Sequence, residues 1–228
     1  MQPLFTIGHS HHSLENFIAL LQQHNVTALA DVRSMPYSRR LPQFNRQVLE
    51  KQLPPTEIRY VFLGKELGAR PENPSCYVDG KALYENIAAT PEFSQGIKRI
   101  LKGVQSHRIA LMCAEKDPIT CHRAILVCQH LVPFNLEIGH ILHDGSLEYH
   151  EDLEERMLKL HHLQEEKLGD QLSLFADDPT PKLTREERLK TAYHRQGLKI
   201  AYVEKEQSEN GSPGFGMVSL DYLIGECS

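Results

Sequence analysis

The segment LMCAEKDPITCHR, which ends at Arg123, carries the densest group of reactive side chains in the chain. An apolar run leads into a polar loop broken by proline, and the pattern predicts a helix over residues 121–131. A helix that begins at Cys121 offers free N–H groups to an anion, and Arg123 adds a guanidinium suited to phosphate or carboxylate. We therefore expect an anion-binding site here. The alternative is that the cysteines are buried packing residues and that Arg123 pairs internally with Asp31 or Glu115.

The two cysteines of this segment allow two other chemistries. A cysteine at a helix N-terminus has a lowered pKa, so a thiolate nucleophile is one interpretation. The spacing is not that of the phosphatase loop, because nine residues separate Cys113 from Arg123 and one separates Cys121 from it. Metal binding is the other interpretation, but the spacings fit no standard zinc finger or zincin, and we expect no metal or cofactor. The side chains of suitable type are His9, Cys113, Cys121, His122 and His143.

A second polar group follows an earlier apolar run. Asp31-Val-Arg33 is followed by Ser38 and Arg39, so that two arginines and a hydroxyl can hold a phosphate. The alternative is a structural ion pair between Asp31 and either Arg33 or Arg123.

The elements that must position these residues alternate along the chain. Apolar runs without alternation predict buried strands at 4–8, 28–32, 60–63, 108–113 and 136–142. Helices are predicted between them: one capped by Ser13, and others near 45–53, 81–89, 92–105 and 121–131, with residues 64–80 forming a long loop. This order predicts an α/β fold of three layers, with a mainly parallel sheet of about five strands and helices on both faces.

Polar residues follow the predicted strands, whereas the opposite edge of the sheet receives joints such as Ser106-His107. In an open parallel sheet, ligands bind outside the carboxyl ends of the strands. We therefore predict one site at that edge. Its expected catalytic residues are His9, Asp31, Glu115 and His122, and its expected anion-binding residues are Ser10, Arg33, Ser38, Arg39, Cys113, Cys121 and Arg123.

Composition and net charge bear on the ligands and the cellular location that we expect for such a site. The 228 residues carry a formal net charge of −5, so any contact with nucleic acid needs a local basic patch. The sequence shows no signal peptide and no apolar stretch long enough to cross a membrane. The cysteines Cys76, Cys113, Cys121, Cys128 and Cys227 form no CxxC pair, which favours reduced thiols in the cytoplasm.

The sequence changes character after a core domain expected over residues 1–146. Residues 147–168 read as a charged helix, and residues 169–182 as an exposed linker. Residues 183–228 are expected to form a helix–strand extension. Its helix opens with a capping box at Thr184-Arg-Glu-Glu187 and closes at Gly197, and a strand is predicted over 199–203.

Several separated motifs, in order, resemble the domain of unknown function 488 family over residues 4–205. This resemblance implies a fold and a set of positions but no reaction. At residue 69 an alanine stands where a third glycine-like residue is expected. The matching pieces are Thr6-Ile-Gly-His-Ser10, Asp31-Val-Arg33, Pro36-Tyr-Ser-Arg39, Phe44-Asn45, Leu63-Gly-Lys-Glu-Leu-Gly68, Cys113-Ala-Glu-Lys-Asp-Pro118, Cys121-His-Arg123, His140-Ile-Leu, Ala192-Tyr193 and Ile200-Ala-Tyr202.

The linker contains Gln171-Leu-Ser-Leu-Phe175, which resembles the pentapeptide that docks DNA-processing proteins on the bacterial sliding clamp. In this mode Gln171 enters a polar pocket, and Leu172, Leu174 and Phe175 fill an apolar cleft, while Ser173 spaces them. The alternative is a short strand packed on the domain.

Together these patterns favour a cytoplasmic enzyme that acts on nucleic acid or a nucleotide and is recruited through the clamp. One alternative is a non-catalytic nucleotide or nucleic-acid adaptor at the clamp. Another is a thiol redox or metal-dependent protein that uses Cys113 and Cys121.

Overall fold

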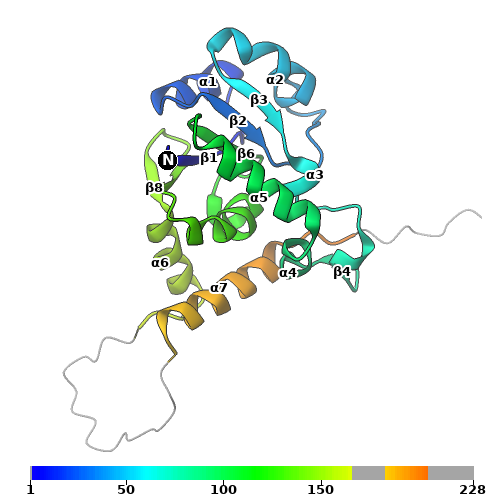
Figure 1. Ribbon diagram of the computed structural model, residues 1–228, viewed down its shortest axis with the longest axis vertical. Helices are drawn as coiled ribbons and strands as arrows, with labels where there is room; N and C mark the ends of the chain where they lie inside the picture. Colours follow the sequence, from blue (N-terminus) through cyan, green and yellow to red (C-terminus); the bar gives the residue numbers. More distant parts are fainter. Residues whose placement is uncertain (1, 166–182, 205–228) are drawn as a thin grey trace, which may run out of the picture.

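A computed structural model of the chain describes residues 2–165 and 183–204. Its six-stranded sheet has the order β3-β2-β6-β1-β7-β8 (Figure 1). The first five of these strands run parallel, and β8 pairs antiparallel with β7, so the predicted mainly parallel α/β fold is confirmed. The strands are β1 (Leu4–Gly8), β2 (Ala28–Asp31), β3 (Arg59–Phe62), β6 (Ile109–Cys113), β7 (Ile138–Ile141) and β8 (Leu147–Tyr149).

Helices cover both faces because alternate residues of each buried strand point to opposite cores. Ala110 and Met112 of β6 join one core with α1 (Leu14–Gln23) and α2 (Arg46–Gln52). Ile109 and Leu111 join the other, which includes α5 (Pro91–Gly103), α6 (His150–Leu160) and α7 (Arg185–Ile200). As predicted, Ser13 caps α1, its Oγ accepting a hydrogen bond from the Asn16 N–H at 3.1 Å.

The connection after β3 has more structure than the predicted long loop. It contains α3 (Gly64–Leu67), the short turn η3 (Pro74–Cys76) and a hairpin of β4 (Tyr77–Val78) with β5 (Lys81–Ala82). The helix predicted from residue 81 therefore begins later, as α4 (Tyr84–Ala88), because Lys81 and Ala82 bond to the hairpin partner instead. Other short turns are η1 (Pro42–Phe44), η2 (Pro54–Thr56) and η7 (Val132–Phe134).

The helix predicted over residues 121–131 is present as a continuous but irregular helical segment rather than a regular α-helix. After the 3-10 turn η4 (Pro118–Thr120), it consists of the π-helical turn η5 (Arg123–Val127) followed directly by the 3-10 turn η6 (Cys128–His130). The N–H groups of Ala124 and Ile125 donate to the Cys121 carbonyl, so the segment begins at Cys121 as predicted, and the anion site expected there stays a prediction.

The C-terminal part confirms the predicted capping box of α7, in which Thr184 and Glu187 bond to each other's backbone N–H. Gly197 lies inside this helix and does not end it. A Cβ at Gly197 would lie 3.3 Å from the Tyr84 ring, so the glycine permits the close approach of α7 to α4. The predicted strand over 199–203 reduces to a bridge between Val203 and Lys81, because α7 continues to Ile200.

In the part of the chain that the structure describes, no helix combines the length and apolarity needed to cross a membrane. The pentapeptide Gln171–Phe175 lies outside the described residues.

Candidate functional site

A cavity of about 470 Å³ opens at the carboxyl ends of the central strands. Strand β6 lies between β1 and β2, and Gly8 pairs with Cys113 while Asp31 pairs with Met112. The segments that follow these three strands therefore emerge side by side, although they are far apart in the sequence. The cavity is lined by His9, Arg33, Ser34, Met35, Tyr37, Ser38, Leu41, Ala69, Arg70, Tyr84, Cys113, Ala114, Glu115, Thr120, His122, Ile200 and Tyr202.

Arg33 reaches the cavity wall with its guanidinium held from behind by Asp31. The Arg33 Nε lies 2.9 Å from Asp31 Oδ1, and its Nη2 lies 2.6 Å from Asp31 Oδ2 and 2.8 Å from the Phe44 carbonyl. The Tyr60 hydroxyl donates to Asp31 Oδ2 at 2.7 Å. Burial lowers the pKa of Arg33, but the bonds to Asp31 outweigh it and raise that pKa overall. Asp31 is fully buried, so it orients the arginine and does not meet a ligand itself.

His9 is a neutral positioning group in this arrangement. Its Nδ1–H donates to the Ser10 carbonyl at 3.3 Å, and its Nε2 accepts from Arg33 Nη1 at 3.2 Å. The ring stacks on Phe44 with 4.4 Å between centroids. Burial, followed by the charge of Arg33, lowers the pKa of His9 to about 4. The neutral ring therefore helps to fix Arg33, and the expected catalytic role of His9 stays a prediction.

Four ionisable side chains converge on the floor of the cavity: Cys113, Glu115, Cys121 and His122. Their ligand atoms all lie within 4.8 Å of one another. The His122 Nδ1 is 3.6 Å from Cys113 Sγ and 3.9 Å from Cys121 Sγ, and Cys121 Sγ is 3.0 Å from Glu115 Oε2. The His122 Nε2 lies 2.9 Å from the Val32 carbonyl, which can only accept, so Nε2 carries a hydrogen. In neutral His122 the lone pair is therefore on Nδ1 and faces the sulfur atoms.

The electrostatics of this group separate its two thiols. Burial raises the pKa of Cys113 well above the usual value, and the nearby Cys121 adds to this shift. Burial also opposes ionisation of Cys121, but the Cys113 hydrogen bond and the Arg123 charge hold the pKa of Cys121 well below its usual value. Burial, followed by the negative charge of Cys121, raises the pKa of Glu115. Cys121 is therefore the thiol of the two that ionises more readily.

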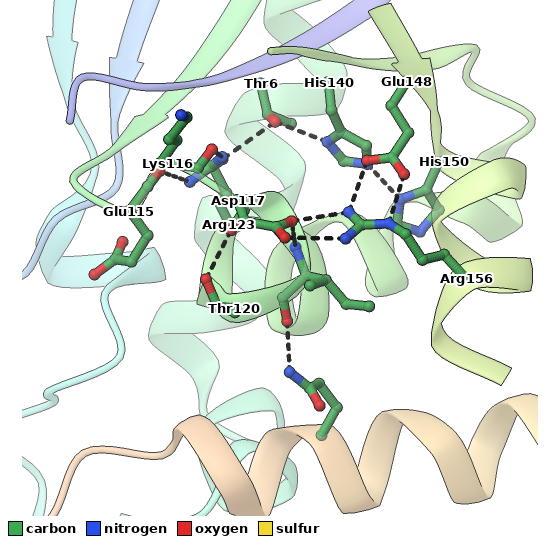
Figure 2. A network of polar contacts seen from close by, with 12 residues as sticks. Thr6, Glu115, Lys116, Asp117, Thr120, Arg123, His140, Glu148, His150 and Arg156 are labelled. Carbon is green, nitrogen blue, oxygen red and sulfur yellow. Dashed lines mark hydrogen bonds and ion pairs between the residues drawn. The ribbon is translucent and has the colours of Figure 1, made fainter. Parts of the chain in front are cut away.

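Arg123 is fully buried behind this group and does not line the cavity. Its Nη1 donates to the Glu115 carbonyl at 2.8 Å, and its Nε lies 3.3 Å from Thr6 Oγ1 (Figure 2). Gly8 leaves room for this contact, because a Cβ there would lie 1.8 Å from the Glu115 carbonyl oxygen. The expected anion-binding role of Arg123 does not fit, and neither does a side-chain pair with Asp31 or Glu115. Arg123 instead shapes the loop that presents Glu115.

The remaining predicted residues divide between the cavity and its surroundings. Ser38 lines the cavity, although its Oγ accepts a bond from the Leu41 N–H at 3.1 Å and supports the loop. Ser10 and Arg39 are not among the lining residues. His143 stacks on His12 with 4.1 Å between ring centroids, away from the two cysteines.

The sequence reasoning missed part of the cavity wall. Tyr37, Tyr84 and Tyr202 line it, and the Arg70 guanidinium lies over the Tyr202 ring at 4.4 Å. Tyr202 follows α7 and reaches the cavity from the C-terminal extension. The motif Ile200-Ala-Tyr202 marked this position but carried no signal that it would return to the sheet edge.

A second group of buried titratable residues lies beside the site, and none of them lines the cavity described above. The Thr6 hydroxyl bonds to His140 Nδ1 at 2.8 Å, and His140 Nε2 bonds to His150 Nδ1 at 3.0 Å (Figure 2). The His150 Nε2 then lies 2.8 Å from the Tyr193 hydroxyl, which donates to Glu154 Oε1 at 3.0 Å. We call this group the histidine chain. One direction of donation satisfies each link with both imidazoles neutral.

Comparison with known proteins places the chain in one family. Searches of curated proteins and of solved structures gave no significant match. A family model described as "Domain of unknown function DUF488" matches residues 13–129, which is more than half of the 228 residues. The matched region contains β2, β6 and the Cys113–Arg123 segment. The chain therefore belongs to the DUF488 family.

Proposed function

We propose that the cavity binds the phosphate-bearing part of a nucleotide or nucleic acid and catalyses its hydrolysis. The observation that carries this proposal is the convergence of Arg33 and Arg70 with Glu115 on one cavity of about 470 Å³. That volume lies within the range of about 300–1,000 Å³ common for small-molecule sites. Arginine guanidiniums suit phosphate oxygens, and Tyr37 and Tyr202 offer aromatic faces to a base.

Glu115 is the best-placed acid–base group in this cavity. Its carboxyl group lines the cavity, and its raised pKa brings it nearer to neutral pH, where general acid–base catalysis is most efficient. In the proposed reaction, the oxygen of a water molecule bonds to the electrophilic atom and its proton passes to Glu115. The leaving atom takes the electron pair of the broken bond and the proton from Glu115. Removal of a base and cleavage of a phosphodiester are both compatible with this step.

The test is a calorimetric titration of the full chain with nucleoside monophosphates and short single-stranded DNA. Arg70→Ala should weaken binding at least tenfold, because it removes a guanidinium from the cavity. Arg59→Ala is the matched control, since Arg59 is an exposed arginine at the start of β3, at the opposite edge of the sheet. Equal affinities of Arg70→Ala and the wild type, or no binding by either, would contradict the proposal.

An adaptor without catalysis is the second candidate, and Glu115→Gln separates it from an enzyme. This variant keeps the size of the side chain but removes its acid–base chemistry. If wild-type protein converts a bound nucleotide or oligonucleotide and Glu115→Gln binds it without conversion, the site is catalytic. Conversion is followed by mass spectrometry of the products. Binding without conversion by either protein supports the adaptor.

We further propose that Gln171–Phe175 recruits the protein to DNA through the bacterial sliding clamp. This proposal rests on the sequence: three large apolar residues stand between Asp170 and Asp177, in a poor place for core packing. A pull-down with purified clamp tests it. Leu174→Ala/Phe175→Ala should abolish capture, whereas the control Asp177→Asn/Asp178→Asn should retain it. Equal capture of the wild type and the Leu174→Ala/Phe175→Ala variant would refute clamp recruitment and leave the cavity proposal standing.

A further inference from the structure

We infer that Cys113, Cys121 and His122 bind a divalent, thiophilic metal ion such as zinc, with the fourth coordination position facing the cavity beside Glu115. This inference departs from the expectation, based on the spacing of the residues along the chain, that no metal binds. It deepens the account of the cavity but does not rest on a nucleotide being the substrate.

The geometry of the three ligand atoms is close to that of a tetrahedral site. With typical Zn–S and Zn–N bond lengths, the N···S edge of a tetrahedron is about 3.6 Å. The His122 Nδ1 lies 3.6 Å from Cys113 Sγ and 3.9 Å from Cys121 Sγ. All four candidate ligand atoms lie within 4.8 Å of one another, so closing around an ion needs shifts of about 1 Å or less.

The surroundings of His122 match those of a metal ligand. Its Nε2–H donates to the Val32 carbonyl at 2.9 Å, which fixes the ring and leaves the Nδ1 lone pair toward the sulfur atoms. Metal-binding histidines usually donate their second ring N–H to a carbonyl or carboxylate in this way. The backbone bond therefore prepares the imidazole to coordinate before any ion arrives.

The buried charge also supports an ion at this position. Cys113 and Cys121 are almost fully buried, and two thiolates without a cation there would be costly. A divalent ion neutralises both thiolates. The remaining charge of Glu115 is matched by the guanidinium of Arg123, which is buried and bonded to the Glu115 carbonyl. The complete group is then electrically neutral.

The position of Glu115 indicates a site that is open on one side. Cys121 is buried beneath the cavity, whereas Cys113, His122 and Glu115 line it, and Glu115 is the most exposed of the four. Three protein ligands with one open position are typical of catalytic zinc, which lowers the pKa of a bound water to about 7. Glu115 would lie next to that water and accept its proton.

The test is the metal content and cobalt spectrum of the full chain, without reference to activity. Purified wild-type protein should contain one zinc ion per chain. After removal of zinc and reduction, Co²⁺ should give thiolate charge-transfer absorption and the visible bands of a tetrahedral site. Absence of both signals from the reduced wild-type protein would overturn the inference. A disulfide between Cys113 and Cys121 whose reduction restores no cobalt binding would overturn it as well.

Variants identify the ligands. Cys113→Ala and Cys121→Ala should each lower the affinity for Co²⁺ at least a hundredfold, while Cys76→Ala should match the wild type. Cys76 is an equally buried free cysteine outside the cluster. Glu115→Gln should still bind one ion, because Glu115 is not one of the three fixed ligands. Unchanged affinity in Cys113→Ala, or complete loss in Glu115→Gln, would contradict the arrangement. Circular dichroism checks folding, and the wild-type cobalt spectrum decides the matter if the cysteine variants unfold.

Discussion

Two buried polar groups that contain histidine lie side by side in this molecule and differ in the partners that their imidazoles contact. In the histidine chain, His140 and His150 use both ring nitrogens, and donation runs from the Thr6 hydroxyl to the Glu154 carboxylate, which accepts the last hydrogen bond. The other group consists of Cys113, Glu115, Cys121 and His122, and we call it the cysteine cluster. In it, the His122 Nε2–H donates to a backbone carbonyl, and Nδ1 faces two sulfur atoms 3.6 and 3.9 Å away. Sulfur is a weak hydrogen-bonding partner, so these contacts hold Nδ1 less firmly than nitrogen and oxygen partners hold the rings of the histidine chain.

This difference is the basis for proposing that one group is structural and the other functional. Buried polar groups with strong partners at every atom stabilise one packing arrangement and have nothing left to offer a ligand. A group held by weaker sulfur contacts at a cavity can exchange them for an ion or a substrate. Arg123 touches both groups, through Thr6 on one side and the Glu115 carbonyl on the other, so one buried cation supports both.

The largest effect on stability is expected from Asp31→Ala, which leaves Arg33 buried without its carboxylate. Removal of one partner of a buried ion pair costs about 3–5 kcal/mol. Glu50→Ala, at the exposed pair with Arg46, should cost less than about 1 kcal/mol. Urea unfolding of both variants checks the difference. Similar losses in the two would show that Asp31 does not anchor the cavity wall.

A somewhat smaller loss, about 3 kcal/mol, is expected from Gly8→Ala. The new methyl group would lie 1.8 Å from the Glu115 carbonyl oxygen, so the loop that carries Glu115 must move. Gly139→Ala in the neighbouring strand β7 is the control, because its nearest contact would be an ordinary 3.4 Å. Equal stability of the two variants in urea would show that the loop after β6 tolerates displacement.

The histidine chain predicts a stability that falls in acid. Burial lowers the pKa of His150 from 6.5 to about 4, and that of His140 well below its usual value. The unfolded chain therefore takes up protons between pH 6.5 and 4 that the folded chain does not. The shifted pKa of His150 alone lowers the free energy of unfolding by about 3 kcal/mol as the pH falls through that interval. The groups that face His150 are His140, Tyr193 and Glu154. His140 and Tyr193 bond to the His150 ring, whereas the Glu154 carboxylate bonds to Tyr193 and not to that ring.

The measurement is the difference in pH dependence between the wild type and His150→Gln. Thermal or urea unfolding from pH 7 to pH 4 should show the steeper decline in the wild type, because the variant lacks the titrating ring. If stability falls equally with pH in the two proteins, the pKa of His150 lies near its ordinary value. That result would contradict a histidine chain in which both imidazoles are neutral.

The smallest effect on stability is expected at the end of the histidine chain, where Tyr193 bonds to Glu154. Tyr193→Phe removes the hydroxyl between His150 and Glu154 and should cost about 1–2 kcal/mol. Tyr149→Phe, at an exposed tyrosine, should change stability by less than about 0.5 kcal/mol. Unfolding curves that do not separate these variants would mean that the chain contributes no stability.

The sequence predicted the sheet and the edge at which the site lies, because runs of buried residues and polar strand ends are local signals. His9 and Arg33, which follow two other strands, line one cavity with Cys113, as parallel strands predict. The direction in which each side chain points, and the partners that it contacts, were not predictable in this way. Arg123 and Arg33 are both arginines after strands, yet Arg123 turns inward because the Glu115 carbonyl and Thr6 accept its N–H groups. Tyr202 reaches the cavity only because α7 returns across the fold.

The most direct test of the contrast between the two groups is the stoichiometry of Co²⁺ binding to reduced wild-type protein, Cys113→Ala and Tyr193→Phe. The account predicts one tightly bound ion in the wild type and in Tyr193→Phe, and none at the same concentration in Cys113→Ala. If Tyr193→Phe loses the ion while Cys113→Ala keeps it, the metal belongs to the histidine chain and the assignment of the cysteine cluster as the functional group is wrong.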